Sequence, residues 1–437
     1  MKVYTRILIG AGCVALLAIS WFLAVNSKSS AEKQLELLAQ AAEYINSGIY
    51  IRAVPLLEEA AGLNAAHTQV AEEELKKVYI ALSGSRGFSR RYTGLLERQM
   101  SRRDAKPDVF AEAAEYYLGI SRIQEALTVL KTGIERTGSA ELVQMYENNR
   151  YAYETNRAIF DYISAIFGAT AQVERDGLWG LARAGGAMLI PCEYDMISTY
   201  NVDRAIVAKG GEIYAVDREN NRVALLREQA SDFGNFADNR IPICIDGSWR
   251  RASGEFIIGS AAFEEIGTYS GGYAAAKVDG KWGVIGLGTD WLIPPVYDGI
   301  IQDELGRCYS RGAVFIQSGD SVYLFAGGSQ IGEAYEDARP FSNEGYAAVK
   351  RYGKWGFIDL DGRVVISFAF DDALSFGQHL AAVKLGDYWG YISLSGRIVI
   401  HPEFLEAKSF SSGSAPVLTA RGWQFITLVE YKRGVSL

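Results

Sequence analysis

The first pattern along the chain is an uncharged apolar run, "ILIGAGCVALLAISWFLAV", at residues 7–25. About 20 such residues form a helix that can cross a bilayer, because a helix pairs its backbone polar groups internally. Lys2 and Arg6 precede the run, and Trp21 lies near its far end, where an indole suits the headgroup region. We expect a single-pass anchor with its N-terminus in the cytoplasm and residues 26–437 outside. A secreted protein after signal-peptide cleavage is the alternative, although no good cleavage site follows the run.

After a polar stem at 26–33, two stretches with helical periodicity follow, at 34–64 and 107–138. Small residues recur in them where two helices must approach closely, and large residues take the partner positions. The small positions are Ala41, Ala53, Ala60, Ala114, Ala126 and Gly133, and the large ones are Tyr44, Leu57, Tyr117 and Leu130. The stretches resemble tetratricopeptide repeats, which implies stacked helical hairpins. We therefore expect a helical domain at 34–157, with a degenerate hairpin at 70–103 and a closing helix capped by Ser139.

The remaining residues, 158–437, repeat one unit. Aromatic or aliphatic anchor positions fall at 179, 213, 249, 282, 322, 355, 389 and 423, with gaps of 34, 36, 33, 40, 33, 34 and 34 residues. Each unit has alternating strands and polar turns and ends in an aromatic-acid-x-hydrophobic segment. No pattern of helical length interrupts the region, so it should be an all-β repeat array.

The anchor strands, such as "WGFI" and "WGVI", are apolar on both faces, so neighbouring sheets must cover both. Stacked propeller blades meet that requirement. The last unit ends after the Trp423 strand, whereas an extra aromatic-acid segment, 159–167, precedes the first anchor. We therefore predict an eight-bladed β-propeller closed by strand 159–167, which leaves no open sheet edge. Seven blades or an open β-solenoid are the alternatives.

Four units place Trp directly before Gly: Trp179-Gly180, Trp282-Gly283, Trp355-Gly356 and Trp389-Gly390. Our hypothesis is that each Trp packs over the Gly position of the next unit, which would make Gly283→Val destabilising. In the units with Ile213-Tyr214 and Val322-Tyr323, the large ring would have changed faces.

Together with endings such as "IPPVYD" at Ile293–Asp298, these units resemble the WG (KWG) repeats of bacterial proteins. The resemblance implies a β-rich repeat array, often joined to other modules, without an assigned chemistry. Trp249-Arg250 and Trp423-Gln424 depart from the motif, so the resemblance is weaker in those units.

The charge pattern argues against nucleic acid as a partner. The net charge is −8, and residues 158–437 carry 25 Lys and Arg against 34 Asp and Glu, whereas phosphate binding needs a basic surface. One segment, 86–106, holds seven basic residues. It is either a solvated helix face or a contact for anionic lipid or an acidic partner.

No catalytic, cofactor-binding or metal-binding residues are predicted, and no cofactor is expected. Cys192, Cys244 and Cys308 lack paired spacing, and His67, His379 and His401 are scattered. Acidic segments recur at the period of the blades, with Asp195, Asp298, Asp371 and Asp372. Such recurrence favours capping of backbone donors over a catalytic dyad.

The sequence thus predicts a membrane-anchored interaction module, not an enzyme. A helical stalk would present the β domain outside the membrane to a protein or a cell-envelope polymer. A propeller-type enzyme and a glycan-binding sensor domain remain the alternatives, and the residues that bind the ligand stay unknown.

Overall fold

The computed structural model describes residues 29–85, 87–288 and 290–431. The chain divides between Tyr146 and Glu147 into two compact units, one helical and one of β-sheets. The predicted membrane span, 7–25, lies outside the described residues. Among the helices that are described, none is both long and apolar enough to cross a membrane.

The helical unit contains seven helices within the described part of the chain. These are α2 (Ser30–Asn46), α3 (Tyr50–Gly62), α4 (Thr68–Ala81), α5 (Phe88–Ser101), α6 (Pro107–Gly119), α7 (Ile123–Thr137) and α8 (Ala140–Asn149). The first begins inside the predicted stem, because Ser29 and Glu32 form a capping box that satisfies free backbone N–H groups at its start.

The predicted small positions lie where helices pack against one another. Ala41, Ala53 and Ala60 are completely buried. At Gly133 in α7, an added Cβ would lie 2.8 Å from the Phe110 side chain, so this crossing is closer than alanine allows. The hairpin packing agrees with the predicted positions, and the tetratricopeptide likeness stays a resemblance.

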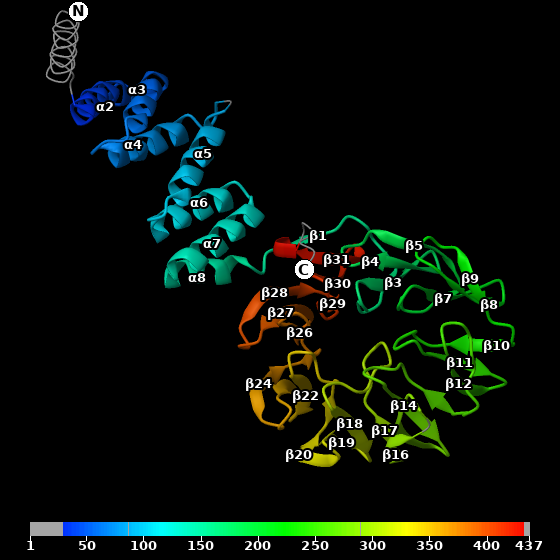
Figure 1. Cartoon of the computed structure of the whole chain (residues 1–437). Coiled ribbons are helices and arrows are strands. Elements are labelled where there is room, and N and C mark those ends of the chain that lie inside the picture. The colour runs from blue at the N-terminus through cyan, green and yellow to red at the C-terminus, as the bar shows by residue number, and fades with distance from the viewer. Residues whose placement is uncertain (1–28, 86, 289, 432–437) are drawn as a thin grey trace, which may run out of the picture. The chain divides into compact units, whose positions relative to one another are not determined.

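The β unit consists of eight antiparallel sheets, here called blades 1 to 8, arranged in a ring (Figure 1). The first strands of the blades are β2 (Tyr162–Ile163), β6 (Met196–Ile197), β10 (Ala230–Phe233), β13 (Glu265–Ile266), β17 (Gly299–Ile300), β21 (Asp337–Ala338), β25 (Asp372–Ala373) and β29 (Glu406–Ala407). The second are β3 (Thr170–Arg175), β7 (Ala205–Lys209), β11 (Ile241–Ile245), β14 (Tyr273–Val278), β18 (Ala313–Ser318), β22 (Ala347–Arg351), β26 (Leu380–Leu385) and β30 (Ser414–Thr419).

The third strands hold the eight predicted anchors, one in each blade. They are β4 (Leu178–Arg183), β8 (Glu212–Val216), β12 (Ser248–Ala252), β15 (Lys281–Gly286), β19 (Ser321–Ala326), β23 (Lys354–Ile358), β27 (Tyr388–Ser393) and β31 (Gly422–Leu428). The fourth strands, on the outside of the ring, are β5 (Met188–Tyr194), β9 (Arg222–Leu225), β16 (Trp291–Tyr297), β20 (Ser329–Tyr335), β24 (Val364–Phe370) and β28 (Ile398–Phe404). Blade 3 has three strands, and the fourth strand of blade 8 comes from the other end of the unit.

That strand, β1 (Tyr153–Thr155), closes the ring. It pairs antiparallel with β31, with Tyr153 opposite Leu428 and Thr155 opposite Ile426. The predicted eight-bladed propeller is confirmed, but its closing strand lies earlier than predicted. The segment 159–167 supplies β2 to blade 1 and touches blade 8 through a bridge between Phe160 and Trp423. Consequently the β unit begins before residue 158.

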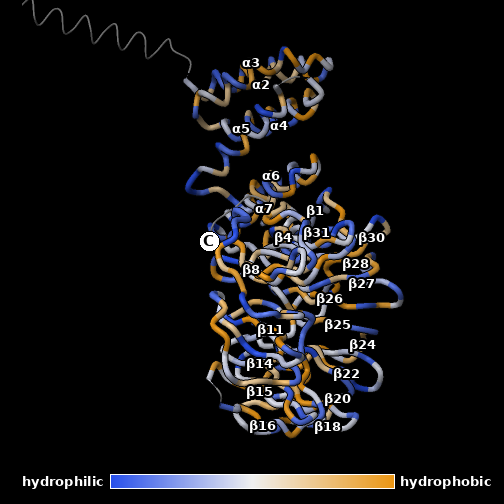
Figure 2. Tube along the Cα trace, turned by 90° about the vertical axis from the view of Figure 1, so that its right-hand side faces the viewer, coloured by the Kyte–Doolittle hydropathy of each residue, from blue (hydrophilic) through white to orange (hydrophobic). Residues whose placement is uncertain are grey.

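Apolar side chains fill the spaces between neighbouring blades. In β23, Trp355 and Phe357 face blade 7, where they pack with Ile392, whereas Ile358 faces the core shared with blade 5. Figure 2 shows hydrophobic segments alternating with polar ones throughout the β unit. Both faces of the sheet are covered, as the two-sided apolar pattern predicts.

Candidate functional site: the central channel

The recurrent acids, the best sequence candidates for chemistry, are structural caps. Asp195, Asp298 and Asp371 each accept a backbone N–H from the turn between the second and third strands of the following blade, at 2.7–2.9 Å. Asp372 instead accepts the N–H of Ala373. The predicted capping role is therefore confirmed for three of these residues.

The lysine of the Lys-Trp-Gly motif holds such an acid at the start of the next blade. The Lys281 Nζ lies 2.7 Å from Asp298, and Lys354 makes the same contact with Asp371. The N–H of Gly319 and the Lys281 ammonium lower the pKa of Asp298. Lys354 and the N–H of Gly386 lower that of Asp371. These carboxylates stay charged and bridge adjacent blades.

The glycine of the Trp-Gly motif lies against different atoms from those predicted. An added Cβ at Gly283 would lie 2.5 Å from the Ile293 carbonyl oxygen and 2.8 Å from the Pro295 nitrogen, both in the outer strand of the same blade. This strand bulges there, because one residue of β15 lies opposite three of β16. The glycine thus makes room for its own blade's backbone, and not for the next Trp.

The tyrosine units vary this arrangement. Tyr214 packs on the core shared with blade 1, whereas Ile213, at the anchor position, faces blade 3, so the large ring has changed faces as predicted. In that blade Tyr214 pairs directly with Leu225, and the register shift lies further on, between Ala215 and Val216. The wide bulge does not depend on Gly, because blade 5 has Tyr323 at this place and the same bulge, with Val322 opposite Tyr335 and Leu324 opposite Ile331.

The other candidate residues are dispersed. Cys192, Cys244 and Cys308 are free thiols, and burial raises the pKa of Cys308 to about 12. His379 and His401 are exposed, and His67 precedes α4. Within the described ranges, no group of three His, Cys, Asp or Glu is placed to hold a metal ion.

The centre of the ring holds a feature that the repeat pattern only hints at. The gap of 40 residues between anchors 282 and 322 leaves extra residues after β17, and we call residues 302–307 the central loop. The Leu305 carbonyl accepts hydrogen bonds from Asn235 Nδ2 at 3.2 Å and from the Thr268 hydroxyl. The Gly306 carbonyl accepts the Thr268 N–H at 2.8 Å. The loop of blade 5 is thus anchored on blades 3 and 4.

Gly267 makes this anchoring possible. A Cβ there would lie 2.2 Å from the Gln302 Oε1 and 2.6 Å from the Gly306 carbonyl oxygen. Leu305 is also buried. The loop is consequently a packed part of the ring, not a free surface excursion.

From this loop, Glu304 reaches the opposite side of the ring. Its Oε2 lies 2.7 Å from the Lys408 Nζ in blade 8, and its Oε1 accepts the N–H of Ala165 in blade 1. The lysine ammonium lies over two aromatic rings, 5.5 Å from the centre of Tyr162 and 5.3 Å from that of Trp423. Burial disfavours the charge of Lys408, but Glu304 outweighs it and the pKa is raised.

A cavity of about 280 Å³ adjoins this group. It is lined by Gln172, Trp179, Met196, Ile197, Phe233, Gly234 and Asn235. The Tyr162 ring connects the two places, with its centre 5.9 Å from Trp179 and 5.6 Å from Trp423. A row of three aromatic rings, Trp179, Tyr162 and Trp423, thus connects the cavity with Lys408.

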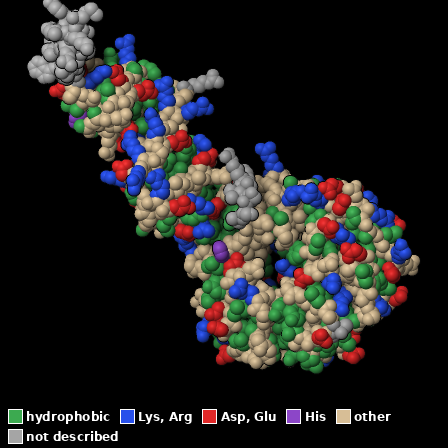
Figure 3. Space-filling view, in the orientation of Figure 1, with side chains coloured by type: hydrophobic (Ala, Val, Ile, Leu, Met, Phe, Trp, Pro, Cys, Tyr) green, Lys and Arg blue, Asp and Glu red, His purple; other side chains and the backbone are tan. Residues whose placement is uncertain are grey.

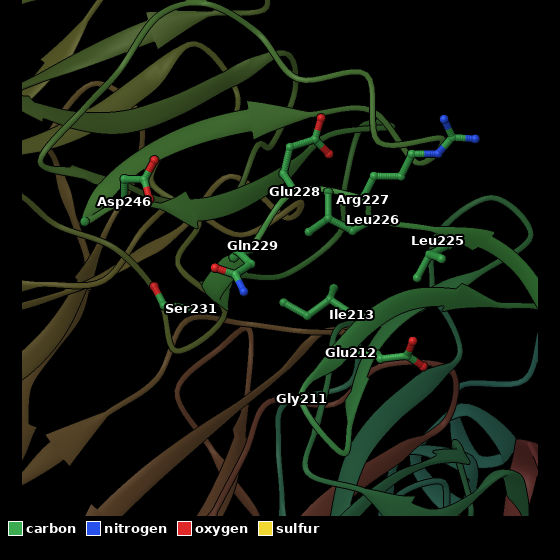
Figure 4. A pocket seen from close by; sticks show the side chains of 12 residues that line it. Gly211, Glu212, Ile213, Leu225, Leu226, Arg227, Glu228, Gln229, Ser231 and Asp246 are labelled. Carbon is green, nitrogen blue, oxygen red and sulfur yellow. The ribbon is translucent and has the colours of Figure 1, made fainter.

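A second pocket, of about 740 Å³, opens between blades 2 and 3 (Figure 4). By strand register, Ser231 stands where other blades have the capping acid, and Glu212 stands where the motif has its lysine. The contact between blades 2 and 3 thus lacks the lysine–acid bridge that Lys281 and Lys354 form in their blades. Glu212 pairs with Arg222 instead.

Sequence reasoning did not find Glu304, Lys408 or Ala165. The one hint in the sequence is the gap of 40 residues between anchors 282 and 322, which is longer than the other gaps between anchors. That a loop from blade 5 meets blades 1 and 8 depends on closure of the ring, which brings together residues about 140 and 100 positions apart.

The sequence profile "WG containing repeat" matches residues 179–212, 252–282, 334–355, 355–389 and 389–420. This chain is a WG-repeat protein. The matches at 179–212, 355–389 and 389–420 each begin in the third strand of one blade and continue into the next blade, so one WG repeat spans parts of two neighbouring blades. A comparison with curated proteins finds no match to this sequence.

Several solved structures are similar in fold at low identity. Kluyvelomyces marxianus Hsv2 is 8% identical, with 54% of this chain and 93% of that chain covered and a TM-score of 0.37. A eukaryotic initiation factor is 10% identical, with 63% and 88% covered and a TM-score of 0.37. The Neurospora crassa Pan2 WD40 domain is 9% identical, with 62% and 89% covered and a TM-score of 0.34. The propeller assignment rests on the strand pairing of this chain itself.

Proposed function

We propose that this WG-repeat protein is an interaction scaffold that is tethered to the cell membrane through residues 7–25 and presents its β unit outside it. The helical unit would serve as a spacer between the tether and the propeller. The partner would be a protein or a polymer of the cell envelope. The observation that carries the proposal is the central channel, where an apolar cavity lies beside a lysine held over aromatic rings.

The charged groups support a binding role over a catalytic one. The acids that recur with the blades are engaged by backbone N–H groups and lysines, so they keep the ring together instead of converging on one point. On the visible face in Figure 3, acidic and basic side chains are interspersed, without a field of one sign. Catalysis by general acid and base would need titratable groups that converge on one reacting atom.

The proposal is tested by photo-crosslinking from the channel in the full-length protein. The photoreactive amino acid p-benzoylphenylalanine replaces Met196, which lines the cavity and is 37% exposed. The control position is Val364, which is 50% exposed on the outer strand β24. After illumination of intact cells, we expect an adduct of defined mass from position 196 that position 364 does not give. Equal adducts from both positions would contradict a binding site in the channel.

A further inference from the structure

The contact between Glu304 and Lys408 differs from the other repeated ion pairs of the ring. The motif pairs join adjacent blades, whereas this pair crosses from blade 5 to blade 8. Arg339 shows the difference, because it occupies the same place in blade 6 as Lys408 does in blade 8. It lies 4.3 Å from the Trp355 ring centre but pairs with Asp337 and Asp372, next to it.

The place that Glu304 fills is built for a carboxylate. Each carboxylate oxygen has its own donor, the Lys408 Nζ for one and the Ala165 N–H for the other. The lysine side chain is 14% exposed and lies against Tyr162 and Trp423, which fixes its direction. Two separate donors on adjacent elements match the two oxygens of a carboxylate better than a single hydroxyl or amide oxygen.

The central loop does not depend on Glu304 for its conformation. Asp303 Oδ1 accepts the N–H groups of Leu305 at 3.0 Å and of Arg307 at 2.9 Å, and Leu305 is buried. The Glu304 side chain, by contrast, is 29% exposed. It can therefore leave Lys408 while the backbone of the loop stays in place.

We propose that Lys408 and the Ala165 N–H form a carboxylate-binding site of the channel, which Glu304 fills in the free protein, and that an acidic side chain of a partner protein replaces it. This rests on the proposed scaffold function and specifies its partner. The cavity lined by Trp179 and Phe233 is separated from Lys408 by the Tyr162 ring, and it would receive a neighbouring part of the partner segment that carries the acid. Glu304 is an internal competitor, because a tethered carboxylate acts at high effective concentration.

The test uses the full-length chain in detergent and the probe acetyl-Gly-Glu-Gly-amide, with acetyl-Gly-Gln-Gly-amide as its neutral counterpart. Dissociation constants are measured by NMR on the probes. Removal of the competitor in Glu304→Ala should tighten binding of the acidic probe at least about tenfold relative to the unmodified protein. The neutral probe should not show this gain.

Two double variants assign the site. Glu304→Ala with Lys408→Met should lose the gain, whereas Glu304→Ala with Arg339→Met should keep it. The proposal is overturned if Glu304→Ala binds the acidic probe no tighter than the unmodified protein, or if the gain survives Lys408→Met. In those cases an adduct from position 196 would still support the scaffold, so the two proposals can fail separately.

Discussion

Lys354, Trp355 and Gly356 stand next to one another in β23, and each contacts a different part of the ring. The lysine reaches the Asp371 carboxylate of the next blade, and the Trp ring fills the core between the two blades. The glycine lies under the bulged outer strand, where an added Cβ would meet the Ile366 carbonyl oxygen at 2.8 Å. Three consecutive residues can make these different contacts because successive side chains of a strand point to opposite faces of the sheet.

The bulge in blade 4 predicts that alanine substitutions at two glycines of β15 have different effects on stability. Gly283→Ala should lower the free energy of unfolding by about 1–3 kcal/mol, because the new methyl group meets rigid backbone atoms. Gly286→Ala is the matched control in β15, where the nearest atom would be 3.6 Å away. Denaturant unfolding of both variants checks this, and equal stabilities would contradict the close approach.

The capping acids predict a loss of stability in acid. The pKa values of Asp298 and Asp371 are lowered in the folded protein. Their contribution is therefore complete above the unfolded pKa of about 3.9 and disappears as the pH falls through the lower folded value. Unfolding measured against pH should show the unmodified protein more stable than Asp371→Asn near neutrality, with the difference vanishing in strong acid. A difference that is independent of pH would refute this.

At the scale of the elements, very short strands close the ring and lead into its central loops. The first strands of seven blades have two residues each, yet they begin the loops that meet at the channel. The closing strand β1 has three residues, and Asn156 just after it donates its N–H to the Phe425 carbonyl at 2.9 Å. Tyr153 packs on Phe404, with ring centres 6.0 Å apart. Closure thus depends on a segment shorter than any pattern search would select.

Truncation tests this closure. A fragment of residues 158–437 lacks β1, whereas 150–437 keeps it and starts after α8. The shorter fragment should melt roughly 5 °C or more below the longer one, because it loses the three residue pairs between β1 and β31 and leaves the edge of β31 open. Thermal unfolding by circular dichroism measures both. The same melting temperature for the two fragments would mean that β1 does not hold the ring.

At the scale of the whole molecule, the closed ring determines which blades meet at its centre. Eight similar blades leave one irregular place at the centre, where the central loop of blade 5 carries Glu304 to Lys408 of blade 8. Each blade contributes little to this site by itself. Only the ring brings blades 1, 5 and 8 together.

The proposed membrane tether at residues 7–25 predicts where the protein is found in the cell. Deletion of residues 1–25 should move the protein from the membrane fraction to the soluble fraction, because the apolar run would be lost. Fractionation followed by immunoblotting measures this. With the run present, protease added to the outside of spheroplasts should digest the β unit, as the predicted orientation requires. Protection from the protease would reverse the orientation.

The sequence by itself determined the repeat, the number of blades and the role of the recurrent acids, because these follow from local period and from pairing between neighbours. It also located the small residues of the helical hairpins. Tertiary structure alone decided that Gly283 makes room for its own blade, that β1 closes the ring, and that Glu304 meets Lys408. These contacts join backbone bulges or residues far apart in the chain, and their positions are set only when all eight blades have closed.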